Sequence, residues 1–349
     1  MAALSRYNFP TMHYRKLPNS DLELSAVGFG LWTVSTSWWG IEDDAVGIDL
    51  MCKAYDLGVT FYDTADTYGN GKGETILAEA LGDVRDKIVI GTKFGYDFYN
   101  FGEKREGQRE IPQDFSVRHL RLALEESLRR LRTDYIDIYL LHNPRLWAID
   151  SDDLFAELEA VKSEGKVRHY GVTMGPAIGW EAEGVAAIER RDITVFQMIH
   201  NLLEQDPGRR FLEAAGRREV GMLVRVPHSS GMLEGQYTAD TTFSPKDHRS
   251  HRPKEWLTEG LKKLEQLRFL HEGVERTIGQ AAIQYLLGHA RITSVLPNIY
   301  NAAQLREFAE APDTPPLTED EIRRVDSLYD ANYGLPRVQV AAEAVAAKR

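Results

Sequence analysis

The chain of 349 residues contains one cysteine, Cys52. A single cysteine can form neither an intrachain disulfide nor a cysteine-rich metal site, which favours a reducing compartment and predicts a cytoplasmic protein. Cys52 lies among apolar residues of a helix-like segment. We therefore expect it to pack as a small hydrophobic residue and not to act as a nucleophile.

Long apolar runs and excess positive charge are also missing. No stretch reaches the roughly 18 apolar residues of a membrane span, and the N-terminal residues 1–20 lack the continuous apolar core of a signal peptide. We expect neither a membrane-embedded protein nor one secreted by this segment. Lys and Arg total 42 against 53 Asp and Glu, a net charge of −11, which argues against a nucleic-acid partner because such a surface needs clustered cations.

What remains is the composition of an ordinary globular chain. Hydrophobic residues make up 43% and charged residues 27% of the sequence, enough to bury a large core. No stretch has the composition of a linker, so we predict one domain over residues 1–349, with residues 335–349 as a C-terminal tail. The expected partners are small molecules, and the sequence leaves a homo-oligomer open.

Strand-like and helix-like patterns alternate along the chain. Strands are expected at residues 26–31, 60–64, 87–93, 135–142, 167–173, 194–197, 220–226 and 292–297. Apolar residues spaced three and four apart predict helices at residues 42–58, 116–132 and 152–165. Several strands are near-continuous apolar runs, which is typical of parallel sheets covered on both faces. Eight strand–helix units of roughly 30 to 40 residues predict an α/β fold, a (β/α)8 TIM barrel, whereas a doubly wound sheet would usually stop at five or six strands.

Other segments complete the expected architecture. MHYRKL and LELSA flank the turn PNSD and predict an N-terminal β-hairpin that caps the bottom of the barrel. Long loops follow the third strand, at residues 94–115, and the seventh strand, at residues 227–256. Loops of this length in a compact domain usually serve a function.

Ionisable residues stand at the ends of three consecutive strands. Asp63 ends the second, Lys93 the third and His142 the fourth, and Tyr68 follows five residues after Asp63. Sites in this fold gather at the carboxyl ends of the strands. An adjacent ammonium such as Lys93 would stabilise a phenolate at Tyr68, Asp63 would compensate the lysine charge in a partly dry pocket, and His142 would direct a substrate carbonyl toward Tyr68.

Each of these four residues also has an ordinary alternative. Asp63 could cap a turn, and Tyr68 could pack over a loop. Lys93 could extend to solvent, and His142 could be a hydrogen-bonded core histidine. Four such coincidences at consecutive strand ends are less expected than one acid–base cluster.

Four segments in this order resemble the signature segments of the aldo-keto reductase family. They are TFYDTADTYGNGKGET (60–75), IVIGTKFG (88–95), YIDIYLLHNP (135–144) and GKVRHYGVT (165–173). The similarity runs from about Tyr14 to Tyr329, and four ordered motifs are a specific signal. The resemblance implies hydride transfer between NADP(H) or NAD(H) and a carbonyl carbon. It also implies a catalytic tetrad: Asp63, Tyr68, Lys93 and His142, with Tyr68 as proton donor.

The resemblance further implies a set of cofactor contacts. These positions are Trp32, Asp63, Thr173, Gln197, Arg225, His228, Gly231, Asn298 and Gln304. Two positions in this region depart from the family pattern, since Met174 stands where a donating Asn is usual and Arg225 where an aromatic residue is usual. Arg225 could stack on the nicotinamide ring or form an ion pair at the rim.

The last strand region departs further from the family. Asn298 stands where Gly is usual, Tyr300 where Arg is usual and Phe308 where Asn is usual, while Gln304 is kept. Loss of that Arg removes the obvious partner of a 2′-phosphate, although Arg306 lies close in sequence. The choice between NADH and NADPH therefore stays open, and core packing could equally explain Phe308.

Substrate identity is only outlined by the sequence. Trp32, Trp38 and Trp39 follow the first strand, and the loop at residues 94–115 carries several aromatic and charged residues. A sugar, a sugar-derived ketone or a small aldehyde is expected, in that order. The alternative to a carbonyl reductase is a regulatory subunit that binds cofactor, because some relatives of this fold, such as potassium-channel β subunits, act mainly as partners.

Overall fold

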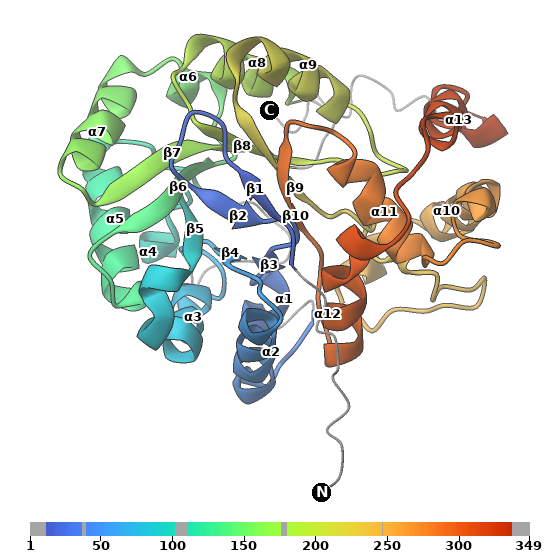
Figure 1. Cartoon of the computed structure of the whole chain (residues 1–349). Coiled ribbons are helices and arrows are strands. Elements are labelled where there is room, and N and C mark those ends of the chain that lie inside the picture. The colour runs from blue at the N-terminus through green and yellow to red at the C-terminus, as the bar shows by residue number, and fades with distance from the viewer. Residues whose placement is uncertain (1–11, 37–39, 102–110, 176–179, 246, 337–349) are drawn as a thin grey trace, which may run out of the picture.

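The wall of the molecule is a barrel of eight parallel strands (Figure 1). The strands are β3 (Phe29–Gly30), β4 (Phe61–Asp63), β5 (Val89–Phe94), β6 (Ile136–His142), β7 (Val167–Thr173), β8 (Val195–Ile199), β9 (Gly221–Arg225) and β10 (Ile292–Leu296). The computed structural model describes residues 12–36, 40–101, 111–175, 180–245 and 247–336. The strands follow one another in the sheet in chain order, which confirms the (β/α)8 fold.

The barrel closes between its first and last strands through a short seam. Val27 forms a parallel bridge with Val295. The amide of Gly28 donates to the carbonyl of Val295 at 2.9 Å, and the amide of Val295 donates to the carbonyl of Ala26 at 2.9 Å. Residues 26–31 therefore run along the barrel wall where a strand was expected. Only Phe29–Gly30 forms a regular strand, which pairs with β4.

Helices surround the barrel on its outer side (Figure 1). They are α1 (Trp32–Ser35), α2 (Asp44–Asp56), α3 (Lys72–Leu81), α4 (Phe98–Phe101), α5 (Val117–Leu131), α6 (Leu146–Ile149), α7 (Asp152–Ser163), α8 (Glu181–Arg190), α9 (Gly208–Arg218), α10 (Lys254–Gln266), α11 (Ile278–Leu287), α12 (Ala302–Ala309) and α13 (Glu319–Asp330). The expected helices at 42–58, 116–132 and 152–165 correspond to α2, α5 and α7.

Helix ends follow local side-chain chemistry. Ser116 begins α5 by accepting a hydrogen bond from the His119 amide at 3.2 Å, which satisfies a backbone donor that the helix itself leaves free. The same helix ends at Arg132, whose φ of 53° lies in the left-handed region and so cannot continue a right-handed helix. Asp43 and Ser151 begin α2 and α7 in the same way as Ser116.

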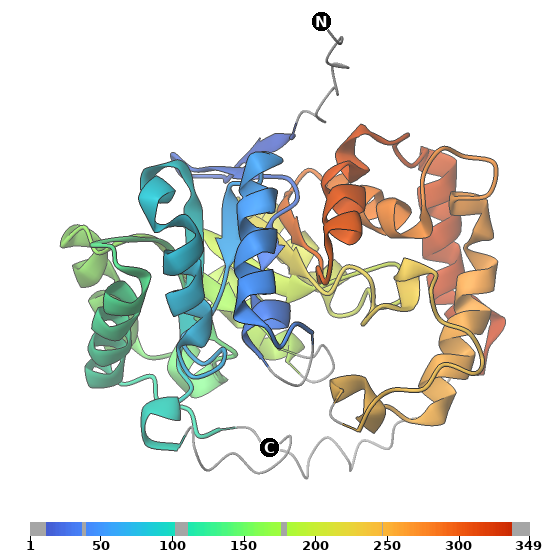
Figure 2. The ribbon, with the colours of Figure 1, turned by 90° about the horizontal axis from the view of Figure 1, so that it is seen from below.

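The N-terminal hairpin closes one end of the barrel. Strands β1 (Tyr14–Lys16) and β2 (Glu23–Ser25) pair antiparallel. Leu17, Leu22 and Leu24 are buried in one apolar cluster with side chains of the barrel strands. The predicted cap is thus present, and it seals the bottom of the barrel with apolar side chains. Figure 2 shows this hairpin at one end of the molecule and α4 at the opposite end.

The two long loops contain short helices. Helix α4 lies within the segment after β5, and the segment after β9 contains the 3-10 turns η3 (Met232–Glu234) and η4 (His248–His251) before α10 begins.

Cys52, on α2, is half-buried and its Sγ lies 3.6 Å from the Ala80 carbonyl oxygen. In the described part of the chain, no helix is long and apolar enough to cross a membrane.

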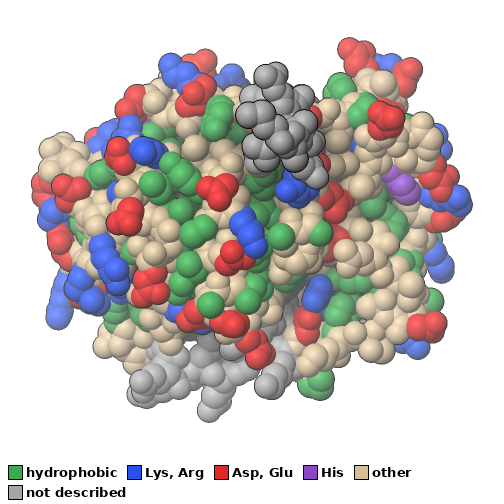
Figure 3. Space-filling view, turned by 60° about the horizontal axis from the view of Figure 1, so that its bottom comes forward, with side chains coloured by type: hydrophobic (Ala, Val, Ile, Leu, Met, Phe, Trp, Pro, Cys, Tyr) green, Lys and Arg blue, Asp and Glu red, His purple; other side chains and the backbone are tan. Residues whose placement is uncertain are grey.

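Acidic and basic side chains are mixed over the face that Figure 3 shows. Elsewhere in the described structure, ion pairs join neighbouring helices, such as Arg121 of α5 with Glu164 beyond α7 at 2.7 Å and Arg217 of α9 with Glu189 of α8 at 2.7 Å. Exposed pairs of this kind contribute little to stability. Their even distribution is that of a solvated surface.

Candidate active site

The open end of the barrel carries the four residues expected to form the catalytic cluster. Asp63 is the last residue of β4, Lys93 lies near the end of β5, and His142 is the last residue of β6. Tyr68 lies in the connection between β4 and α3. All four lie at the carboxyl ends of neighbouring strands, at the end opposite the hairpin, and are at most 8% exposed.

The centre of the site is a buried ion pair. Lys93 has no exposed surface, and its Nζ lies 2.6 Å from Oδ1 of Asp63 and 2.5 Å from the carbonyl oxygen of Thr64. A buried ammonium is costly unless it is paired and hydrogen-bonded. Asp63 supplies a counter-charge and Thr64 a second acceptor, so the Lys93 side chain has two partners inside the barrel wall.

Aromatic rings surround this pair. The Nζ of Lys93 lies 4.9 Å from the centroid of the Tyr68 ring, within the range of a cation–π contact. The Tyr68 ring packs edge-on against Trp32 at 4.9 Å and against His142 at 6.1 Å. Tyr96 joins the group by packing edge-on against His142 at 4.9 Å. The structure therefore brings the phenol, the imidazole and the ammonium together.

A chain of hydrogen bonds extends from Asp63 to the next strands. Oδ2 of Asp63 accepts from Nε2 of Gln197 at 2.8 Å, and Oε1 of Gln197 accepts from the hydroxyl of Thr173 at 2.8 Å. Gln197 has no exposed surface, and Thr173 is 1% exposed. Two residues expected to contact the cofactor thus also hold the Asp63 carboxylate in position.

Arg225 ends β9 on the same rim. Its Nη2 donates to the carbonyl of Met174 at 2.9 Å. Its Nε is buried and has no hydrogen-bond partner among the described residues. In the part of the chain that the structure describes, this nitrogen is a free donor at the rim of the barrel.

The segment after β9 brings two more expected residues together. His228 is buried, and its Nε2 lies 3.1 Å from the Gly279 carbonyl oxygen. Burial lowers the pKa of His228 to about 4, so the ring is uncharged near neutral pH. Its ring packs against Phe308 at 4.3 Å, and Phe308 is 1% exposed within the main apolar core, as the core-packing interpretation expects. Gly231 has φ of 92°, and a Cβ there would overlap the Tyr237 hydroxyl.

The last strand region is linked to the same segment. Gln304 of α12 donates from Nε2 to Oε2 of Glu234 at 2.9 Å. Burial raises the pKa of Glu234 to about 7. Tyr300 interacts electrostatically with Arg249. Asn298 is half-buried, two residues beyond β10.

Arg306 is less suited to the role of a phosphate ligand than its position in the sequence indicates. Its side chain is 56% exposed and lies 3.7 Å from a carboxylate oxygen of Glu310 on the same helix. A cation that does interact with Tyr300 is Arg249, some fifty residues earlier in the chain. No sequence pattern indicated this contact, because only the folded loop after β9 brings the two residues together.

Sequence reasoning also missed a buried charged cluster directly behind the tetrad. Asp66 and Glu74 have no exposed surface. Glu74 accepts from Nε of Arg130 at 2.6 Å and from the Thr92 hydroxyl at 2.6 Å. The signal was available in part, since Asp66 is the second acid of the DTAD sequence. Trp38 and Trp39, by contrast, lie outside the described residues, as do residues 102–110 of the loop after β5.

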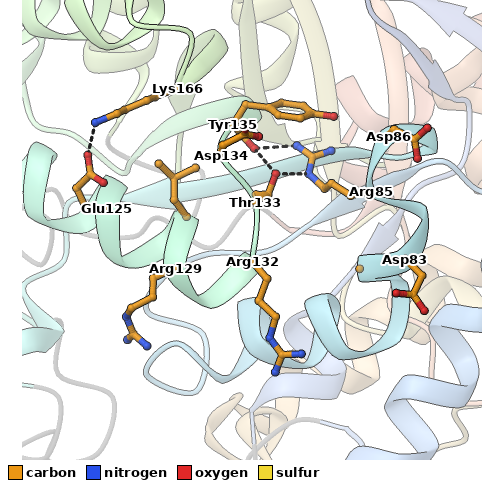
Figure 4. Close-up of a pocket in the computed structure, with 12 residues that line it drawn as sticks. Asp83, Arg85, Asp86, Glu125, Arg129, Arg132, Thr133, Asp134, Tyr135 and Lys166 are labelled. Carbon is orange, nitrogen blue, oxygen red and sulfur yellow. Dashed lines mark hydrogen bonds and ion pairs between the residues drawn. The ribbon is translucent and has the colours of Figure 1, made fainter.

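A surface hollow of about 840 Å³ lies away from these residues (Figure 4). Its lining comes from segments that precede β5, β6 and β7, at the amino ends of the strands. Several of its polar groups are paired with one another, as Lys166 with Glu125 at 2.5 Å and Arg85 with the Thr133 hydroxyl at 3.2 Å. Active sites in this fold lie at the other end of the barrel, so we do not assign the function to this hollow.

The chain belongs to the aldo/keto reductase family, whose sequence profile matches residues 26–330. It is similar to the NADH-specific methylglyoxal reductase of Escherichia coli strain K12, with 28% identity over 85% of this chain and 93% of that protein. It is equally similar to the L-glyceraldehyde 3-phosphate reductase of the same strain, with 28% identity over 90% of this chain and 92% of that protein.

Two further similarities bear on fold and function. The glycerol dehydrogenase AKR11B4 of Gluconobacter oxydans has a solved structure that superposes with a TM-score of 0.79, at 25% identity, over 94% of this chain and 98% of that chain. A probable voltage-gated potassium channel subunit beta of Arabidopsis thaliana is 24% identical over 88% of this chain and 93% of that protein.

Proposed function

We propose that this protein is an NAD(P)(H)-dependent oxidoreductase that transfers hydride between the nicotinamide and a carbonyl or alcohol carbon. The observation that carries the proposal is the buried Lys93–Asp63 pair, with Lys93 4.9 Å from the Tyr68 ring centroid. The family membership supports the same reaction type. On this proposal the protein acts as a single domain, in the cytoplasm.

Each residue of the tetrad has a stated role in this proposal. NAD(P)H supplies the hydride when it is bound. Tyr68 donates the proton to the carbonyl oxygen during reduction and accepts it during oxidation, and the ammonium of Lys93 stabilises the phenolate left behind. Asp63 fixes Lys93, and His142 orients the substrate oxygen toward Tyr68.

Several features of the rim fit a nicotinamide cofactor. Gln197 and Thr173 offer amide and hydroxyl groups next to Asp63, and the buried Nε of Arg225 lacks an acceptor among the described residues. We propose that these three residues hold the nicotinamide end. The adenosine end would be held by residues of the β9 segment and the last strand region, namely His228, Gly231, Asn298 and Gln304, with Trp32 near Tyr68.

The substrate that we propose is a small hydroxylated or dicarbonyl compound. Asn143, next to His142, is 8% exposed and donates from Nδ2 to the Tyr96 hydroxyl at 2.8 Å. Its Oδ1 is buried and has no hydrogen-bond partner in the described chain, so a substrate hydroxyl near His142 would satisfy it. The two reductases and the dehydrogenase named above are each named after a three-carbon compound, which supports a substrate of this size.

A regulatory subunit is the second candidate function. The similarity to a probable potassium channel subunit beta favours it. The buried tetrad favours an enzyme, because cofactor binding alone would not need a buried ammonium beside a phenol. Turnover with NAD(P)H separates the two candidates.

The proposal is tested with the variant Tyr68→Phe. We expect nucleotide affinity to be retained and kcat on the best substrate to fall by a factor on the order of 10² or more, because the proton donor is removed. Substrates are compared in a panel of glyceraldehyde, methylglyoxal, glycerol and sugars, with calorimetry for nucleotide binding.

A matched control is Tyr62→Phe. The Tyr62 hydroxyl is buried and lies 3.2 Å from the carbonyl oxygens of both Met51 and Val59, behind the barrel wall. This variant is expected to keep near-normal turnover. Near-normal turnover of Tyr68→Phe would instead refute the assignment, and failure of the unmodified protein on the whole panel, with intact nucleotide binding, would favour the regulatory subunit.

A further inference from the structure

A cluster of buried ionisable groups lies directly behind the tetrad, outside the roles assigned so far. Asp66 belongs to the same connection as Tyr68, and its amide donates to the carbonyl of Lys93 at 3.2 Å. The groups that interact with its carboxyl come from every element around it. They are the backbone amide of Thr67, Lys93 on β5, Glu74 on α3, Tyr99 on α4, Arg130 on α5 and Tyr139 on β6.

The side-chain hydrogen bonds of this cluster are made by Glu74 and Arg130 and not by the carboxyl of Asp66. The guanidinium of Arg130 donates to Glu74 through Nε at 2.6 Å and to the Tyr99 hydroxyl through Nη2 at 3.1 Å. The other oxygen of Glu74 accepts from the Thr92 hydroxyl. Both carboxyl oxygens of Asp66 are buried and have no side-chain hydrogen-bond partner in the described part of the chain; the backbone amide of Thr67 interacts with this carboxyl.

The charges of the cluster therefore do not balance if both acids are ionised. Each of its two cations already has a carboxylate partner, Lys93 with Asp63 and Arg130 with Glu74. An unpaired carboxylate in a dry environment is strongly disfavoured, and of two nearby acids the one without a partner takes the proton. Burial, reinforced by the negative charge of Glu74, raises the pKa of Asp66 well above its usual value.

We propose that Asp66 is held as an uncharged acid, that the Glu74–Arg130 pair keeps it so, and that this arrangement protects the positive field of Lys93 at Tyr68. A second negative charge near Lys93 would oppose the stabilisation of a phenolate at Tyr68. Asp66 is on this view a positioning residue, which acts through Lys93. The catalytic part rests on the function proposed above, whereas the charge state of Asp66 does not.

The charge state is tested by stability against pH. A group whose folded pKa is raised stabilises the protein fully below the unfolded pKa, about 3.9 for Asp, and this contribution is lost as pH rises toward the folded pKa. Asp66→Asn mimics the neutral acid at every pH. We expect the thermal midpoint of Asp66→Asn, minus that of the unmodified protein, to increase as pH rises above about 4.

A matched control is the same substitution at a paired buried acid. Asp137 has no exposed surface and lies 2.8 Å from Nη2 of Arg85 and 2.6 Å from Nη1 of Arg168. Asp137→Asn should lower the midpoint, because Arg85 loses its counter-charge, while Arg168 keeps Asp21 at 2.6 Å. A constant difference between Asp66→Asn and the unmodified protein, or a deficit that grows with pH, would show that Asp66 is ionised and would overturn the proposal. If Asp66→Asn does not fold, an infrared band of a protonated carboxylic acid in the unmodified protein at neutral pH decides the question, and its absence overturns the proposal.

The catalytic part is tested by releasing Arg130. In Glu74→Gln the guanidinium loses its 2.6 Å carboxylate partner and keeps only the more distant Glu126, at 3.6 Å, so Asp66 should ionise to replace Glu74. We expect the pH–rate profile to move toward alkali by on the order of one pH unit, and this displacement to vanish in Glu74→Gln combined with Asp66→Asn. An equal displacement in both proteins would overturn the link to Lys93. Absence of turnover in the unmodified protein would instead refute the proposed function and leave the stability result standing.

Discussion

Lys93 shows how a single side chain can hold a charge inside the barrel wall. It is completely buried, yet two of its three N–H donors meet Asp63 and Thr64 within 2.6 Å. Gln197 in turn holds the second oxygen of Asp63. The pair is thus fixed from three strands, and removal of either partner leaves the other buried without its counter-charge.

The residue-scale prediction concerns this pair. Lys93→Met removes the ammonium, so any remaining activity should have its pH–rate profile displaced toward alkali. Asp63→Asn acts on the same pair, so the double variant should lose less activity than the sum of the two single losses in free energy. Steady-state rates over a pH series measure both effects. An unchanged profile at full activity would mean that Lys93 has only a structural role.

The site residues that could be predicted are those marked by a local pattern in the sequence. Asp63, Lys93 and His142 each lie at the end of a strand, and strand ends are readable from apolar runs and from the resemblance to the family. Glu74 and Arg130 lie on helices whose buried faces are mostly apolar, and no local pattern indicates a contact between partners 56 residues apart. Their contact depends on how α3 packs on α5, which the sequence does not state.

At the scale of elements, the segment after β9 changes the expectation for the cofactor. Arg249 donates to Tyr237 at 2.6 Å and to Asp247 at 2.6 Å, and Arg252 donates to Ser230 at 3.0 Å. These contacts place two guanidinium groups in the segment that carries Gly231. The last strand region alone offers only Arg306, which is why the sequence leaves the choice between NADH and NADPH open.

The element-scale prediction is that nucleotide preference depends on pH. Glu234, which accepts from Gln304, has its pKa raised by burial to about 7. Its carboxyl is uncharged at pH values below this pKa and negative above it, so a 2′-phosphate at this end should be repelled only at the higher pH. Calorimetry should give NADH and NADPH dissociation constants within about tenfold at neutral pH, with the ratio moving toward NADH as pH rises through the pKa of Glu234.

Glu234→Gln provides the control for that measurement. The amide cannot ionise, so the pH dependence of the ratio should disappear while the hydrogen-bond partner Gln304 remains. Tyr300→Arg should move the ratio toward NADPH at every pH by adding a guanidinium. If NADPH binds the unmodified protein about a hundred times more tightly than NADH, a difference of roughly 2.7 kcal/mol, the expectation is contradicted and Arg249 becomes the first residue to substitute.

At the scale of the whole molecule, alternation of apolar strands and amphipathic helices was sufficient to predict the barrel. The count and order of strands agree with the sheet, and the N-terminal hairpin is present. The seam was beyond prediction, because a bridge between Val27 and Val295 joins residues at opposite ends of the chain. Local patterns determine elements, whereas closure depends on the accumulated tilt of all eight strands.

The whole-molecule prediction concerns that seam. A Cβ on Gly28 would lie 2.8 Å from Cδ1 of Phe61 and 2.9 Å from Cδ2 of Leu296, so Gly28→Ala should destabilise the protein by about 1 to 3 kcal/mol through overpacking. Denaturant titration measures the loss. Gly82→Ala is the matched control, because a Cβ at that position would have no atom within 4 Å and the backbone there is helical; it should be neutral or slightly stabilising.

The hairpin that seals the barrel has a consequence for the order in which the protein can be completed during synthesis. Leu17, Leu22 and Leu24 are synthesised before every strand of the barrel wall, yet their apolar cluster includes Leu296 of the last strand. Until β10 is made, the barrel is incomplete, so the hairpin leucines cannot be fully covered. A chain cut short before β10 therefore lacks one side of this cluster, and its incompletely covered leucines would be a target for chaperones and for aggregation.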